Sequence, residues 1–184
     1  MTILPSPLQS RDLIGVAAPA GYLAEHERYR RGCELLRDMG FEIYEAEKKW
    51  PGYGYLADTD EARIKELHRL WERQEIKAIF CLRGGFGSLR LLTHLDLDLL
   101  RVQPKIFIGF SDITILHNHI IDKTGTMCLH GPGLAALSDC DQPSQERLFH
   151  CLKGDWHRSL KENIEVIRPA ASASGPLLGG NLSS

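Results

Sequence analysis

The chain has 184 residues, 43% of them hydrophobic and 25% charged, which is enough to bury a core as one globular domain. Its net charge of −2 gives no electrostatic reason to expect a nucleic acid or an anionic membrane as partner. No apolar run approaches the roughly 20 residues of a membrane span, and the N-terminus lacks the pattern of a secretory signal. The five cysteines form no C-x-x-C pair, which is typical of a reduced, cytoplasmic protein without a disulfide framework or zinc site.

Short apolar runs alternate with helical patterns along the chain. The expected strands cover residues 12–18, 41–44, 77–82, 105–110, 126–130 and, more briefly, 163–167. Helices are expected over residues 25–39, from residue 58 onward, after residue 111 and over residues 141–153. Strands that are buried on both sides and separated by helices predict an α/β fold with a mainly parallel sheet, covered on both faces.

The second expected helix has a start signal and an apolar stripe. Asp58 is the expected N-cap, with Glu61 three residues later. The apolar stripe of this helix is Ile64, Leu67, Leu70 and Trp71, and we expect Ile64, Leu67 and Trp71 in the core.

Three loops follow expected strands, after residues 82, 110 and 130. Ligands of open parallel sheets bind beyond the carboxyl ends of the strands. We therefore expect these loops to form the functional site.

Ser111 stands between an apolar strand and a helical pattern. A serine on such a turn presents its hydroxyl above the sheet, and the amides that follow it point toward developing negative charge. Gly109-Phe-Ser111 matches only half of the G-x-S-x-G pattern, because Ile113 replaces the second glycine. From the local sequence alone, Ser111 is either a nucleophile or an ordinary helix N-cap.

The segment Arg83-Gly-Gly-Phe-Gly-Ser88 follows another strand. Adjacent glycines let a backbone approach a ligand closely and direct N–H groups at it. A phosphate cradle, half of an oxyanion hole and a structural turn are all compatible with this loop. Its sequence lacks the Lys-Ser/Thr of a P-loop and the spacing of a dinucleotide-binding loop, which argues against a nucleotide.

Histidines near these loops have several interpretations. His130, in His130-Gly-Pro-Gly133, could serve as the base for Ser111 or as a hydrogen-bonded shaping group. His117 and His119 lie two positions apart on the expected helix and face different sides, so they are poor joint metal ligands.

Taken together, these segments resemble the LD-carboxypeptidase family of serine peptidases, which also contains microcin C immunity hydrolases. The resemblance runs nearly end to end. It is carried by the segments Val16–Pro19, Gly54–Arg63, Ala78–Leu92, Lys105–Thr114, His130–Pro132 and Leu178–Leu182.

The resemblance implies a Ser-His-Glu triad with Ser111 as nucleophile and an oxyanion hole built from the backbone N–H groups of Gly85 and Asp112. Arg83, Gly84 and His130 become candidates for substrate binding. No metal and no other cofactor is implied. The implied fold is a flavodoxin-like, class I glutamine-amidotransferase-like sandwich, completed by a β-rich C-terminal domain that closes over the site and carries the triad Glu and His.

The expected organisation is a nucleophile-bearing domain over residues 1–168, a linker over residues 169–176 and the start of a truncated C-terminal domain over residues 177–184. The implied activity is release of terminal D-alanine from murein tetrapeptide during cytoplasmic wall recycling. A microcin C-type aminoacyl-nucleotide hydrolase and a catalytically incompetent domain of the same fold are the alternatives. We expect the isolated chain to be inactive, to pair with its missing C-terminal part or to form a homodimer, and to bind neither nucleic acid nor membrane.

Overall fold

A computed structural model of the chain describes residues 2–44, 50–156, 174–175 and 178–180. Within these ranges five strands form one sheet in the order β2-β1-β3-β4-β5, and all neighbouring strands are parallel. The strands are β1 (Leu13–Ala17), β2 (Glu42–Ile43), β3 (Ile76–Cys81), β4 (Ile106–Gly109) and β5 (Leu129–His130). The expected parallel α/β architecture is therefore confirmed.

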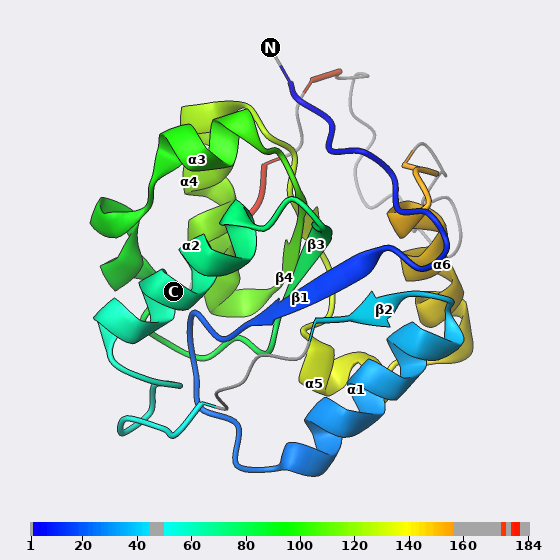
Figure 1. The fold of residues 1–184 in the computed structure, drawn as a ribbon, viewed down its shortest axis with the longest axis horizontal. Helices are drawn as coiled ribbons and strands as arrows, with labels where there is room; N and C mark the ends of the chain where they lie inside the picture. Colours follow the sequence, from blue (N-terminus) through cyan, green and yellow to red (C-terminus); the bar gives the residue numbers. More distant parts are fainter. Residues whose placement is uncertain (1, 45–49, 157–173, 176–177, 181–184) are drawn as a thin grey trace, which may run out of the picture.

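Helices cover both faces of the sheet (Figure 1). One face carries α1 (His26–Asp38), α5 (Leu134–Leu137) and α6 (Gln142–Leu152). The other carries α2 (Asp60–Glu72), α3 (Leu97–Val102) and α4 (Thr114–Thr124). Two short 3₁₀ helices, η1 (Ser88–His94) and η2 (Ser111–Ile113), follow β3 and β4 in the chain.

Each face of the sheet has its own hydrophobic core. Phe80 of β3 belongs to the core beneath α1, with Leu36 of that helix. Its neighbour Ile79 belongs to the core beneath α2 and α4, with Trp71 and Leu116. This alternation follows from the two-residue period of a strand, and it explains why the strands read as unbroken apolar runs.

The start of α2 differs from the expectation. Thr59, not Asp58, is the N-cap, and its hydroxyl accepts a hydrogen bond from the backbone N–H of Ala62 at 3.3 Å. The Asp58 carboxylate instead accepts from the backbone N–H of Thr59 at 2.8 Å. Both side chains are good caps, and the structure begins the helix one residue later.

The last strand is shorter than expected. Residues 126–127 do not pair with β4, because the N-terminal segment pairs with them: the N–H of Met127 donates to the carbonyl of Ile3 at 2.9 Å. The expected strand at 163–167 lies outside the described residues. Only 174–175 of the expected linker and 178–180 of the segment after it are described, so the domain boundaries stay predictions. Every described helix is too short or too polar to cross a bilayer.

Candidate active site

Ser111 begins η2, two residues after the end of β4. Its φ of 58° lies in the left-handed region, which L-residues other than glycine adopt at a cost of roughly 1–2 kcal/mol. The Thr114 hydroxyl donates to the carbonyl of Ser111 at 2.5 Å and supports this turn. Strained backbone of this kind concentrates at functional sites, where the surrounding structure holds it in place.

The glycine loop, residues 83–87, leaves the end of β3 and lies directly against Ser111. A Cβ at Gly84 would lie 2.9 Å from the Cβ of Ser111 and 3.1 Å from the carbonyl oxygen of Phe110. No side chain fits at that separation, so glycine is needed for this approach. The carbonyl of Gly84 accepts a hydrogen bond from the N–H of Gly21 at 3.2 Å, which fastens the loop to the end of β1.

A cavity of about 290 Å³ lies at this edge of the sheet, next to Ser111. Its lining residues are Leu23, Arg28, Leu82, Arg83, Gly84, Gly85, Phe110, Ser111, Gly133, Ala135 and Ala136. The described lining thus includes residues of the glycine loop and two positively charged side chains, Arg28 and Arg83. It includes no histidine and no carboxylate. The expectation that loops after neighbouring strands gather at one edge is met here.

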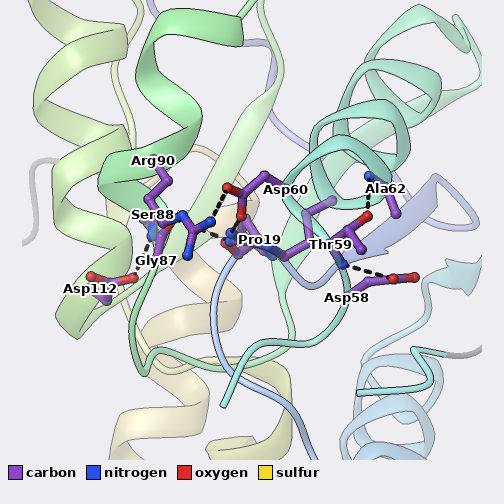
Figure 2. Close-up of polar contacts among 10 residues, drawn as sticks. Pro19, Asp58, Thr59, Asp60, Ala62, Gly87, Ser88, Arg90 and Asp112 are labelled. Atoms are coloured by element: carbon purple, nitrogen blue, oxygen red, sulfur yellow. Dashed lines mark hydrogen bonds and ion pairs between the residues drawn. The ribbon is translucent and has the colours of Figure 1, made fainter. Parts of the chain in front are cut away.

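Asp112 connects the turn at Ser111 to the end of the glycine loop. Its side chain is buried, and one carboxylate oxygen accepts a hydrogen bond from the backbone N–H of Ser88 at 2.8 Å (Figure 2). Asp112 also lies in the first turn of η2, where the backbone N–H groups at the start of the helix stabilise a negative charge. Asp112 therefore has a side chain that fixes the chain at Ser88, while the oxyanion role of its backbone N–H stays a prediction.

Arg83 is exposed at the cavity. Its guanidinium donates to the carbonyl of Tyr22 at 3.0 Å, which aligns it along the cavity wall. A guanidinium in this position suits a substrate carboxylate, because it offers several N–H donors in a planar arrangement.

His130 lies at the end of β5, beside Gly109 of β4, and is exposed. It lines a second cavity, of about 710 Å³, together with His117, Asn118 and Leu178. The described residues therefore place His130 outside the cavity that contains Ser111. Its role as a base or as a shaping group stays a prediction.

His117 is buried on α4, and its Nε2 has no hydrogen-bond partner in the described part of the chain. Burial lowers the pKa of His117 to about 3, and the charge of nearby His130 acts in the same direction. The ring packs edge-on against Phe107, with centroids 5.4 Å apart. His117 is therefore a neutral core residue at physiological pH, and His117 and His119 are not brought together as metal ligands.

Sequence reasoning missed one residue that contacts the glycine loop. Arg63 of α2 is buried, and its guanidinium donates to the carbonyl of Gly87 at 3.3 Å. Two signals for it were present in the sequence: it ends the segment Gly54–Arg63 that carries the family resemblance, and it lies four positions before Leu67, on the core-facing side of the helix.

Comparison with known proteins places these features in a family context. The family model described as LD-carboxypeptidase N-terminal domain matches residues 14–131. A protein of Bacillus subtilis named probable murein peptide carboxypeptidase is 34% identical over 97% of this chain and 57% of its own length. The murein tetrapeptide carboxypeptidase of Pseudomonas aeruginosa is 36% identical over 72% of this chain and 46% of its own.

A third relative is the microcin C7 self-immunity protein MccF of Escherichia coli, which is 36% identical over 72% of this chain and 39% of its own length. A solved structure of MccF in complex with aspartyl sulfamoyl adenosine superposes with a TM-score of 0.75 at 30% identity. That superposition covers 82% of this chain and 47% of the other. The chain thus spans about half the length of the curated relatives that it matches.

Proposed function

The chain belongs to the LD-carboxypeptidase family, and from that premise we propose that it bears the nucleophile of a serine carboxypeptidase that releases terminal D-alanine from murein tetrapeptide. The observation that carries this proposal is the position of Ser111, held with a positive φ against Gly84 at the edge of a cavity. A helix N-cap does not need that strain, and N-caps ordinarily have extended backbone.

In the proposed reaction a histidine takes the Ser111 hydroxyl proton while the oxygen attacks the carbonyl carbon before the terminal D-residue. The backbone N–H groups of Gly85 and Asp112 stabilise the oxyanion of the tetrahedral intermediate. The intermediate collapses, the C–N bond breaks, and the departing amine takes the proton from the histidine. Water then hydrolyses the acyl-enzyme by the same steps. The loss of one oxyanion donor from such a site typically costs about 10²–10³-fold in rate.

The acid–base residues are proposed to come from outside residues 1–184. Two facts support this: the relatives are about twice as long, and the described lining of the cavity has no histidine or carboxylate. A Ser site without its base retains little catalysis. We therefore expect residues 1–184 alone to release D-alanine at least about 10³-fold more slowly than the full-length protein.

The substrate's terminal carboxylate is proposed to bind Arg83, whose guanidinium lies on the cavity wall. Arg28 also lines the cavity and carries a second positive charge, which pairs with Asp139 at 2.5 Å. A positively charged cavity suits a peptide that ends in a free carboxylate.

A second candidate is hydrolysis of an aminoacyl-nucleotide of the microcin type. The structural likeness to MccF bound to aspartyl sulfamoyl adenosine favours it. Both reactions use the same nucleophile and oxyanion donors, so the substrate alone separates them. A binding module without turnover is the third candidate, and any catalysed release would exclude it.

The test measures D-alanine release from murein tetrapeptide, and hydrolysis of an aspartyl sulfamoyl adenosine analogue with a cleavable acyl bond, by the full-length protein. We expect release of D-alanine, with Ser111→Ala lowering kcat at least about 10³-fold. Ser138→Ala is the matched control, because Ser138 is absent from the lining of the Ser111 cavity. D-alanine release that survived in Ser111→Ala would show that this serine is only structural, and nucleotide hydrolysis without D-alanine release would favour the second candidate.

A further inference from the structure

The far end of the glycine loop is held by a buried arginine. Arg63 reaches from the first turn of α2 to the carbonyl of Gly87 at 3.3 Å and also donates to the carbonyl of Pro19, just beyond β1. Its side chain has 0% exposed surface. One guanidinium thus links α2 to backbone carbonyls that follow two different strands.

Arg63 is itself held in a single orientation. Asp60, one turn earlier, accepts from Arg63 at 2.5 Å through one oxygen and pairs with Arg90 at 2.6 Å through the other (Figure 2). Burial alone would raise the pKa of Asp60, but the hydrogen bonds and charges of Arg63 and Arg90 outweigh it and hold this pKa below its ordinary value. The carboxylate therefore stays ionised at neutral pH and keeps the guanidinium in place.

Gly87 adapts to this contact. Its φ of +103° is a conformation that favours glycine, and a Cβ there would lie 2.5 Å from Leu56 and 3.2 Å from the guanidinium of Arg63. The loop therefore comes close enough for the arginine to reach its carbonyl only because the residue has no side chain.

On the other side, Ser88, the residue directly after the glycine loop, is bonded to the turn at Ser111. The N–H of Ser88 donates to the buried carboxylate of Asp112 at 2.8 Å, and Asp112 directly follows Ser111. The loop is thus fastened at Gly87 by α2 and at Ser88 by η2, within three residues of Gly85.

We propose that Arg63 and Asp112 are positioning residues that together hold the glycine loop in register with Ser111, so that the N–H of Gly85 meets the oxyanion. This clamp, defined as Arg63, Asp60 and the Asp112 side chain, rests on the proposed function. It acts through the loop and touches no substrate. Displacement of a reacting group by about 1 Å can cost about 10²-fold in rate, so a loosened loop lowers kcat more than it changes KM.

The test compares four variants of the full-length protein in D-alanine release. Arg63→Met keeps an unbranched, apolar stem but removes the guanidinium and with it every hydrogen bond to the loop, and we expect kcat to fall about 10²-fold with KM within about threefold. Arg63→Lys keeps a positive charge, but its single nitrogen cannot serve both Asp60 and the two carbonyls, which Nη2 and Nη1 of the guanidinium serve separately, so its kcat lies between those of Arg63→Met and wild type. Asp112→Ala lowers kcat about 10-fold or more, and Asp112→Asn, which still offers an acceptor to Ser88, recovers most of that loss.

Trp71→Phe is the matched control for a destabilised α2. It removes one hydrogen bond from the same helix, from the indole N–H to the carbonyl of Gln103 at 2.8 Å, at the end away from the glycine loop. We expect its kcat to match wild type. A kcat for folded Arg63→Met equal to that of Trp71→Phe would overturn the clamp, as would equal kcat values for Asp112→Ala and Asp112→Asn.

Amide hydrogen exchange over residues 84–88 gives a second readout that needs no substrate. The clamp predicts exchange at least about 10-fold faster in Arg63→Met and Asp112→Ala than in wild type, and unchanged exchange in Trp71→Phe. If wild type released no D-alanine, the proposed function would fail, and this exchange would still decide the clamp. If Arg63→Met did not fold, the clamp would be tested by Asp112→Ala, Asp112→Asn and Arg63→Lys instead.

Discussion

Replacing His117 with leucine should remove a loss of stability at acid pH. The imidazole is buried on α4 against Phe107, and its Nε2 has no hydrogen-bond partner in the described part of the chain. Protonation would place a positive charge in this core, so burial lowers the pKa from its ordinary 6.5 to about 3, assisted by the charge of His130. The folded protein therefore resists a proton that the unfolded chain accepts.

The sign and size follow from the two pKa values. Above pH 6.5 neither state binds the proton, and the free energy of unfolding has no contribution from this group. As pH falls below 6.5 the unfolded chain gains the proton first, so the folded state loses stability, and the loss grows until pH reaches about 3. At about pH 4.5, two pH units below the unfolded value, the loss is about 3 kcal/mol.

The assay is urea unfolding of wild type and His117→Leu at about pH 7.5 and about pH 4.5. Other groups titrate in both proteins, so the difference between the two pH responses isolates His117. We expect that response to be smaller in His117→Leu by about 2–3 kcal/mol. His119→Leu, on the same helix but only half-buried, controls for removal of any histidine from α4. Equal pH responses in wild type and His117→Leu would show that the ring is protonated in the folded protein at little cost.

Two further substitutions probe the nucleophile turn. Gly84→Ala places a Cβ 2.9 Å from the Cβ of Ser111, so D-alanine release should fall about 10²-fold, whereas Gly175→Ala, with nothing within 4 Å, should leave it unchanged. Ser111→Gly should be about 1 kcal/mol more stable to urea than Ser111→Ala, because glycine relieves the strain at φ 58° and alanine retains it. Equal stabilities for the two Ser111 variants would mean that the turn holds no strain.

The central strands could be predicted because both of their faces are buried. Every side chain of β4 is buried, so the strand appears as a run of apolar residues with a clear beginning and end. Helix α5 could not be predicted, since Leu134–Leu137 is too short to show a helical period. The predicted N-cap of α2 is one residue too early. Asp58 and Thr59 are both suitable caps, and only the hydrogen bonds in the structure distinguish them.

The sequence predicted where the site lies in the fold, but it did not predict the contacts that fix its residues. Parallel strands end at one edge, so the positions of Ser111 and the glycine loop near each other followed from the order of elements. The contacts that fix them did not follow, because Arg63 and Gly87 are 24 residues apart and meet only after α2 packs on the sheet. Similarly, the sequence assigns Asp112 a backbone role, and the contact of its side chain with Ser88 depends on tertiary structure.

The α2 and η2 side of the cavity and its α1 and α5 side make different contacts with the glycine loop. Arg63 and Asp112, whose side chains hold the end of the glycine loop, belong to α2 and η2, on one face of the sheet. Leu23, Arg28, Ala135 and Ala136 line the cavity from the α1 and α5 side and make none of these contacts. Substitutions on the α1 and α5 wall can therefore alter which side chains fit the cavity while the geometry around Ser111 is preserved, so under the proposed function the specificity of this site could change through mutations on a single face.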